Sequence, residues 1–137
     1  MSTSVREFES VSEFLRSVDD TISEYRKRLG ELLRKLEELR VRAEQEKKLK
    51  AILSKLGLSE STVTNEVALR NVRIVVNPTA MQELAAIEAA VEALNNKVAL
   101  LAAVRKELEI LSGIEVGAKL SVIYVDDVPR TIVLRLS

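Results

Sequence analysis

A heptad pattern of apolar residues over the first part of the 137-residue chain constrains its fold more than any other feature. From Phe8 to Ala43, apolar residues recur at spacings that alternate between three and four positions. This spacing is typical of a coiled-coil helix, because it keeps one apolar seam in contact with a partner helix. The seam comprises Phe8, Val11, Leu15, Val18, Ile22, Tyr25, Leu29, Leu32, Leu36, Leu39 and Ala43.

The first predicted helix covers residues 4–57. Ser4 and Glu7 match a capping box, in which two side chains bind backbone N–H groups at a helix start, so they predict where the helix begins. The seam breaks near 44–48, where charged residues occupy its positions, and apolar residues then resume out of phase. Gly57 is typical of the end of a helix.

A second heptad pattern predicts a helix over residues 78–112, opened by Asn77-Pro78 and closed by Ser112-Gly113. Alanines extend its apolar surface well beyond a single seam, so this helix needs neighbours on more than one side. The seam itself comprises Leu84, Ile87, Val91, Leu94, Val98, Leu101 and Leu108.

Two further segments have the β-branched composition of strands. Residues 66–76 are predicted to form either one strand or a short hairpin that turns at Arg70-Asn71. Residues 119–136 are predicted to form a hairpin around Asp126-Asp127-Val128-Pro129. The two segments lie at opposite ends of the second helix, so we expect them not to pair within one subunit.

The fold class that follows is α+β and mainly α, in a single domain over residues 1–137. The two helices are similar in length and form a long antiparallel coiled-coil hairpin. The short β segment lies at its bend, and the β-hairpin lies at the C-terminus. This arrangement places acidic residues of the second helix near basic residues of the first, namely Glu83 and Glu88 near Arg40 and Arg42.

The strands and the second helix both predict an oligomer. Both faces of the C-terminal hairpin are largely apolar, so we expect helices of the same subunit or a β segment of another subunit to cover it. The expected partners are copies of this chain or related subunits. The residues expected at the oligomer interface are Ala86, Ala89, Ala90, Ala93, Val122, Tyr124, Ile132 and Leu134.

This layout resembles that of prefoldin subunits. The resemblance is carried by the seam from Phe8 to Ala43, by Asn71-Val72-Arg73-Ile74-Val75-Val76 and by Asn77-Pro78-Thr79, and it covers residues 5–112. In that family β hairpins assemble the barrel-shaped base of a hexamer, and free coiled-coil tips hold unfolded clients for a chaperonin. The resemblance therefore implies a chaperone subunit that binds unfolded protein. The hairpin over 119–136 and the alanine-rich second helix depart from the family's pattern.

Composition excludes most enzyme chemistry. The chain contains no Cys and no His, so it lacks thiolate metal ligands, imidazole bases and Cys or Ser–His nucleophile pairs. Its four glycines form no phosphate-binding loop, and Asp126-Asp127 lacks the ligand spacing of a calcium loop. We therefore expect no enzymatic activity, no cofactor and no bound metal.

Nucleic acid is the alternative partner. The whole chain is neutral, with 21 basic and 21 acidic residues, but the first helix has a local excess of positive charge that can follow a phosphate backbone. Acidic residues interleave with the basic ones, and aromatic stacking residues are nearly absent, which makes this alternative the weaker one. The residues concerned are Arg26, Lys27, Arg28, Arg34, Lys35, Lys47 and Lys48.

No apolar stretch approaches the roughly 20 residues that cross a bilayer, and the first ten residues lack the apolar core of a signal peptide. We therefore expect no membrane binding and a cytoplasmic location, and the composition is typical of a thermophile. The leading hypothesis is a non-enzymatic oligomeric coiled-coil scaffold or adaptor, with a prefoldin-like chaperone subunit as its most concrete form. The alternative is a nucleic-acid-associated architectural or accessory factor.

Overall fold

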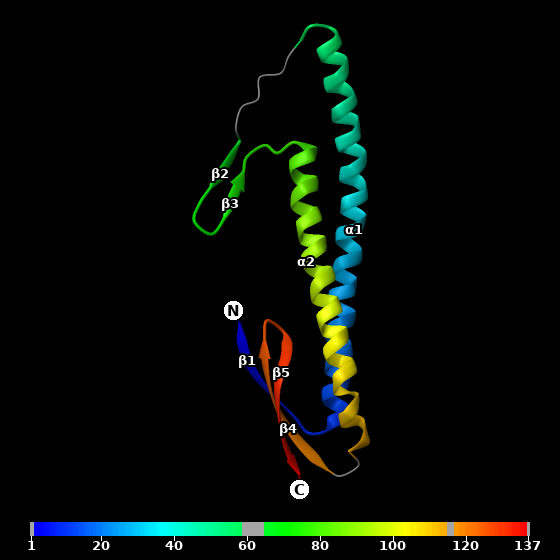
Figure 1. Cartoon of the computed structure of the whole chain (residues 1–137), viewed down its shortest axis with the longest axis vertical. Helices are drawn as coiled ribbons and strands as arrows, with labels where there is room; N and C mark the ends of the chain where they lie inside the picture. Colours follow the sequence, from blue (N-terminus) through cyan, green and yellow to red (C-terminus); the bar gives the residue numbers. More distant parts are fainter. Residues whose placement is uncertain (1, 59–64, 115–116, 137) are drawn as a thin grey trace. The chain divides into compact units, whose positions relative to one another are not determined.

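The computed structural model describes residues 2–58, 65–114 and 117–136 (Figure 1). The fold is α+β and mainly α, as predicted. The described residues belong to two compact units: unit 1 contains residues 1–29 and 93–137, and unit 2 contains residues 30–92. That the chain is a single domain stays a prediction. The elements in chain order are β1 (Thr3–Phe8), α1 (Val11–Lys55), β2 (Glu66–Ala68), β3 (Arg73–Val75), α2 (Ala80–Glu107), the 3₁₀ helix η1 (Leu108–Gly113), β4 (Ala118–Val125) and β5 (Val128–Leu136).

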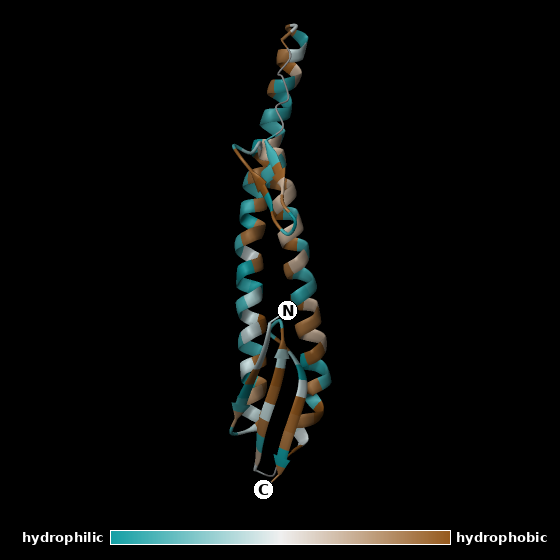
Figure 2. Ribbon diagram, turned by 90° about the vertical axis from the view of Figure 1, so that its left-hand side faces the viewer, coloured by the Kyte–Doolittle hydropathy of each residue, from teal (hydrophilic) through white to brown (hydrophobic). Residues whose placement is uncertain are grey.

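Unit 1 is built around an antiparallel three-stranded sheet in the order β1-β4-β5. Strands β4 and β5 carry the hydrophobic stretches of this sheet, whereas β1 is mainly polar (Figure 2). One face of the sheet packs against the parts of α1 and α2 that belong to this unit. Leu120, Val122 and Tyr124 alternate along β4 and enter a core that also contains Phe14 of α1 and Leu101 of α2.

Helices α1 and α2 run antiparallel within each unit, as the heptad patterns predicted (Figure 1). In unit 1, the Arg105 guanidinium donates a hydrogen bond of 2.8 Å to the Asp19 carboxylate. In unit 2, Arg42 forms the expected ion pair with Glu83, with 3.7 Å between nitrogen and oxygen. Arg40 pairs with a glutamate of its own helix instead.

The prediction that a helix starts at Ser4 is wrong, because residues 3–8 form strand β1. All six residues of β1 pair with β4. This segment includes Ser, Thr and Val, whose helix propensity is weak, so the hydrogen bonds offered by β4 determine its conformation.

The helix starts instead at a second match to the same capping pattern. The Ser10 hydroxyl accepts the backbone N–H of Glu13 at 3.0 Å, and the Glu13 carboxylate accepts the backbone N–H of Glu9 at 3.2 Å. These bonds satisfy two backbone donors at the start of α1 that have no partner within the helix.

Ser10→Ala is expected to lower the free energy of unfolding by about 1 kcal/mol, because it removes this cap. Ser4→Ala is the matched control, and its effect should stay within about 0.5 kcal/mol because Ser4 caps no helix. Urea unfolding of both variants measures the difference. A larger loss from Ser4→Ala would contradict the assignment of the cap to Ser10.

The predicted C-terminal hairpin is confirmed, with a tighter turn than predicted. Asp126 and Asp127 have φ angles of +51° and +69°, as a two-residue type I′ turn requires. Val128 and Pro129 already belong to β5. Proline is tolerated there because β5 is an edge strand and its pairing with β4 shifts register at this point. The helices of the same chain cover the inner face of the hairpin. Cover by these helices was predicted as one alternative, and cover by a β segment of another subunit as the other.

In unit 2, residues 66–76 form a short hairpin, which was one of the two structures predicted for this segment. Strands β2 and β3 pair antiparallel, and the backbone N–H of Leu69 donates to the carbonyl of Val72 at 2.8 Å. The two sheets share no strand, so the two β segments do not pair with each other among the described residues.

The second helix is shorter than the predicted 78–112. It starts at Ala80, because the hydroxyl of Thr79, rather than the side chain of Asn77, accepts the backbone N–H of Gln82 at 3.1 Å. Its α-helical part ends where η1 begins. Although α2 is rich in alanine, no helix among the described residues combines the length and apolar character needed to cross a bilayer.

Candidate functional site

The β2–β3 hairpin of unit 2 carries its large exposed apolar side chains on one face. Val67 lies opposite Ile74, and the chain turns between Leu69 and Val72. Because side chains alternate along a strand, apolar residues at every second position share a side. Their exposed fractions run from 45% at Ile74 to 60% at Val72. We call this surface the hairpin face; it consists of Val67, Leu69, Val72, Ile74 and Val76.

The hairpin also has two open edges. Among the described residues, β2 and β3 pair only with each other. Each strand therefore presents unpaired backbone N–H and C=O groups along its outer edge. Glu66 on β2 and Arg73 on β3 both lie on the side opposite the hairpin face. A two-stranded sheet is only marginally stable in water, so this hairpin is suited to gain strands from a partner.

Amide and hydroxyl groups attach the base of the hairpin to the first turn of α2. Asn65 and Gln82 exchange two side-chain hydrogen bonds, of 2.9 and 2.7 Å. The backbone N–H groups of Thr79 and Gln82 each donate to the other residue's side chain, at 3.0 and 3.1 Å. The backbone carbonyl of Asn65 accepts the N–H of Val76 at 2.9 Å. The hairpin is thus fixed to the helix start rather than held only by a flexible connection.

Glu46 explains the break in the first seam. Its side chain is half-buried, and its two carboxylate oxygens accept the backbone N–H of Ala80 at 3.1 and 3.0 Å. A carboxylate is favourable at this position because a helix start has free N–H groups and a partial positive charge. Glu46, a charged residue at a seam position of α1, therefore lies beside the first residue of α2.

Beyond Glu46, α1 continues to Lys55, and its Leu49 and Ile52 side chains are more than half exposed. Glu46 also lines a groove of about 520 Å³, with Ala43, Met81 and Leu84 as its apolar lining and a rim of three basic and two acidic side chains. We call the exposed apolar residues that follow Glu46 the apolar end; they are Leu49, Ile52, Leu56 and Leu58.

The alanines expected at an oligomer interface lie mostly open on α2. Ala86, Ala89 and Ala93 are exposed, and Ala90 is half-buried. This helix face therefore remains available to a partner.

The sheet residues expected at the interface lie elsewhere. Val122 is 0% exposed and Tyr124 is 7% exposed, and both belong to the core of unit 1. For these two residues the interface prediction is wrong, because the chain's own helices cover the inner face of the sheet. Ile132 and Leu134 are half-buried and pack against the same core.

The side chains predicted to contact nucleic acid are all exposed. Arg28 is already engaged: it pairs with Glu24 at 3.6 Å and lies over the ring of Tyr25. The others form no ion pair within the part of the chain that the structure describes. They are Arg26, Lys27, Arg34, Lys35, Lys47 and Lys48.

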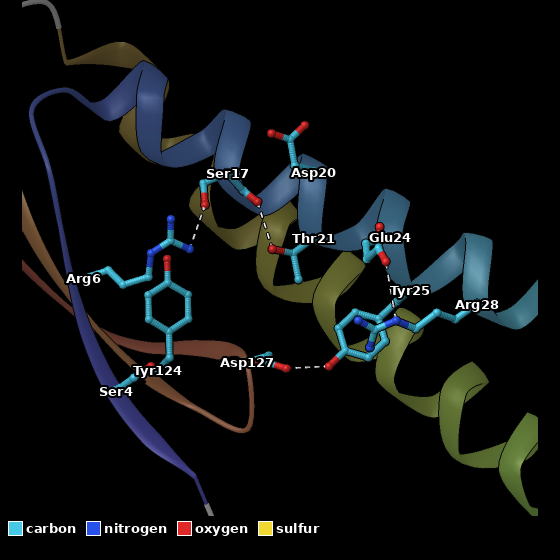
Figure 3. A pocket seen from close by; sticks show the side chains of 10 residues that line it. All are labelled: Ser4, Arg6, Ser17, Asp20, Thr21, Glu24, Tyr25, Arg28, Tyr124 and Asp127. Atoms are coloured by element: carbon cyan, nitrogen blue, oxygen red, sulfur yellow. Dashed lines mark hydrogen bonds and ion pairs between the residues drawn. The ribbon is translucent and has the colours of Figure 1, made fainter.

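Unit 1 contains a second candidate, a pocket of about 410 Å³ between the sheet and α1 (Figure 3). The Tyr25 hydroxyl donates a hydrogen bond of 2.6 Å to the Asp127 carboxylate in the β4–β5 turn. The Tyr124 hydroxyl is buried and has no hydrogen-bond partner among the described residues. We call this the polar pocket; it is lined by Ser4, Arg6, Ser17, Asp20, Thr21, Glu24, Tyr25, Arg28, Tyr124 and Asp127.

The environment of the polar pocket raises the pKa of both tyrosines above the ordinary value of 10.0. For Tyr25 the main cause is the hydrogen bond to Asp127, followed by burial, and Arg28 acts in the opposite direction. For Tyr124 the main cause is burial, opposed by the positive charge of Arg6 and by the nearby Ser17 hydroxyl.

These raised pKa values predict a loss of stability at high pH. Below about pH 10 both tyrosines are neutral in the folded and unfolded chain, so their contribution is complete there. As pH rises further, the unfolded chain loses its tyrosine protons first, and unfolding becomes more favourable. Tyr25→Phe and Tyr124→Phe should each reduce the fall in unfolding free energy between about pH 9 and about pH 11. Denaturant titrations at both pH values measure this, and an unchanged fall in both variants would contradict it.

Comparisons of this chain with protein-family models, curated proteins and solved structures find no match. Within residues 2–58, 65–114 and 117–136, no three acidic side chains lie close enough together to hold a metal ion. The hairpin face, the apolar end and the polar pocket are therefore the candidate sites of this chain.

The sequence reasoning missed the hairpin face and the polar pocket. The hairpin face had a signal, since apolar residues alternate on both sides of Arg70-Asn71. The polar pocket had none, because Arg6 and Tyr124 lie far apart in the sequence and meet only through the pairing of β1 with β4.

Proposed function

We propose that this protein is a non-enzymatic scaffold or adaptor whose copies assemble through the β2–β3 hairpin. The observation that carries this proposal is the hairpin face, whose five side chains are all at least 45% exposed. Exposed apolar surface on a two-stranded sheet with open edges is typical of an interaction site rather than of a finished domain.

The occupant we infer is a second copy of this chain, joined edge to edge. Pairing β3 of one copy with β2 of the next places Arg73 and Glu66 on neighbouring strands of the same face, where opposite charges attract. Pairing two β2 edges, or two β3 edges, would bring like charges together instead. Because the favoured contact joins two different edges, it can repeat and close into a ring.

A prefoldin-like chaperone subunit is the most concrete form of this proposal. In unit 2, helices α1 and α2 flank a β segment, as in that family. The apolar end and the groove lined by Met81 offer exposed apolar surface beside basic side chains, which suits an unfolded client. The sheet of unit 1 is an addition to that layout.

A nucleic-acid-associated factor is the second candidate. It is favoured by the six exposed basic side chains of α1 that have no ion-pair partner among the described residues. Binding through such side chains depends on neutralising phosphates, so it should weaken steeply as salt increases. Salt-sensitive retention on DNA or RNA would favour this candidate over the scaffold.

Light scattering at micromolar concentration tests the proposed assembly. We expect a mass that is a multiple of 15.3 kDa. A mass of one chain would overturn the proposal. Suppression of aggregation of a denatured client, without nucleotide, tests the chaperone form separately.

Ala89→Glu combined with Ala93→Glu is expected to weaken the assembly if the open alanine face of α2 also takes part. Both positions are exposed, so the helix itself should tolerate the change. Dissociation with helicity retained, measured by light scattering and circular dichroism, would place a second contact on α2. An unchanged mass would limit the interface to the hairpin.

A further inference from the structure

The polar pocket of unit 1 contains a cation that the chain leaves without a counter-ion. The Arg6 guanidinium lies 5.1 Å from the ring centre of Phe8 and 5.8 Å from that of Tyr124. Its one hydrogen bond is long, 3.4 Å to the Ser17 hydroxyl, and it forms no ion pair with any described residue. Most of its five N–H donors therefore remain free for a ligand.

The other arginine of the pocket differs from Arg6. Arg28 is paired with Glu24 at 3.6 Å and lies 5.1 Å from the ring centre of Tyr25. Its charge is thus already offset within the chain. The pocket therefore has one end at Arg28, where the arginine charge is paired, and another at Arg6, where it is not; we call the latter the unsatisfied end (Figure 3).

The unsatisfied end also holds the Tyr124 hydroxyl. This group is buried without a partner, and Figure 3 shows it pointing toward the Arg6 guanidinium. A guanidinium cannot accept a hydrogen bond, and the Ser17 hydroxyl, which is near enough to Tyr124 to lower its pKa, accepts a hydrogen bond from Arg6 instead. A buried hydroxyl without a partner is unusual in a native protein. A ligand oxygen between the two groups would accept a bond from each.

The charge of the pocket limits what that ligand is. Asp20, Glu24 and Asp127 also line it, and only Glu24 is neutralised by an arginine. A doubly charged phosphate would place two negative charges beside the remaining two carboxylates, whereas a carboxylate adds one charge. The planar carboxylate also matches the planar donor arrangement of a guanidinium.

We propose that the polar pocket binds the carboxylate group of a ligand, with the Arg6 guanidinium and the Tyr124 hydroxyl as its donors. The Ser17 hydroxyl is close enough to Arg6 to add a third donor once its own bond to Arg6 gives way. Arg6 is held by one long hydrogen bond and two ring contacts, with no ion pair among the described residues, so its side chain can shift and expose the Tyr124 hydroxyl to the ligand. The carboxylate comes either from a small acid or from a peptide.

The experiment uses the two tyrosines as reporters. They are the only tyrosines in the chain, and both line the pocket, so tyrosine absorbance and fluorescence monitor it without background from other sites. The probes are sodium acetate, N-acetyl-trialanine with a free C-terminal carboxylate, its C-terminal amide and inorganic phosphate, all at constant ionic strength. We expect saturable changes with the two carboxylates and none with the amide or phosphate. Equal affinity for both carboxylates identifies a small acid as sufficient, and tighter binding of the peptide identifies a peptide carboxylate.

Variants test the assigned donors. Arg6→Gln should weaken carboxylate binding about tenfold or more, because it removes the charge. Tyr124→Phe should weaken it about threefold to tenfold while keeping the ring in the core, with Tyr25 as the remaining reporter. Arg130→Gln, which removes an exposed cation outside the pocket, should leave the affinity unchanged. The proposal is overturned if neither carboxylate gives a saturable change when it is titrated up to concentrations far above millimolar. It is also overturned if phosphate binds as tightly as the carboxylates, or if a folded Arg6→Gln variant binds them as well as the original chain.

Discussion

Val67→Lys is expected to convert the proposed assembly into single chains of 15.3 kDa. Val67 lies opposite Ile74 on the hairpin face and is 52% exposed in the isolated chain. In the proposed ring, with the hairpin faces turned inward, the lysine ammonium would lose its water without gaining a partner, which costs several kcal/mol. Since about 1.4 kcal/mol corresponds to a tenfold change in affinity, association should weaken by a factor of about a hundred or more. Light scattering over a concentration series measures this change.

Ala68→Lys is the matched control for this experiment. Ala68 is the next residue of the same strand, is also exposed and points to the opposite side. The two variants add the same charge to the same strand on opposite faces. Ala68 lies opposite Arg73, so its lysine also adds a like-charge contact of less than about 1 kcal/mol, which is well below the cost expected at Val67. The mass of Ala68→Lys should stay that of the assembly. Equal dissociation of both variants would show that the edge alone is sensitive, and would contradict a role for the hairpin face.

Leu101→Ala is expected to lower the free energy of unfolding by about 2–5 kcal/mol. Leu101 is 0% exposed and belongs to the unit 1 core with Phe14 and Val122. The truncated side chain leaves a cavity that close-packed neighbours fill only in part. Because small proteins are stable by only about 5–15 kcal/mol, this loss should be plain in a urea titration.

Leu100→Ala makes the same chemical change one residue earlier. Leu100 is 37% exposed and lies outside the buried core. Its replacement should therefore cost less than about 1 kcal/mol, and alanine's higher helix propensity offsets part of that cost. Both titrations should be run at one protein concentration, because association also stabilises the folded chain. Equal losses in the two variants would contradict the packing described for α2.

The two long helices were predictable because their burial follows from periodicity alone. Leu36, Leu39 and Ala43 of the first seam are buried, as are Val91 and Leu101 of the second. A heptad pattern is local, so neighbours along the sequence suffice to reveal it.

The first residues of the chain were not predictable in the same way. The pattern S-x-x-E occurs at both Ser4 and Ser10, and nothing nearby distinguishes the two matches. The distinction comes from β4, which pairs with residues 3–8 from the far end of the chain. Phe14 illustrates the same point: it lies off the predicted seam and is nevertheless 0% exposed, because the sheet covers a second side of α1.

The candidate sites differ in the same way: one depends on local sequence and the other on tertiary pairing. The hairpin face depends on alternation within eleven consecutive residues, 66–76, so the sequence carries its signal, although residues 66–76 were predicted only as a strand or hairpin and not as a site. Val122 and Tyr124 were assigned to an interface because their strand is apolar, but composition does not tell which chain covers a strand. The polar pocket depends on the register that places Ser4 opposite Tyr124, and that register is a tertiary property.

The pairing of β1 with β4 also fixes the order in which the chain is able to fold during synthesis. Unit 2 is one continuous stretch, residues 30–92, so all of its contacts are available once that stretch has left the ribosome. Unit 1 joins residues 1–29 to residues 93–137, and β1 has no partner until β4 has been made. Closing so long a loop is slow compared with forming local helical contacts. During synthesis, the contacts within unit 2 therefore become available before β1 and Phe14 gain the partners that β4 provides.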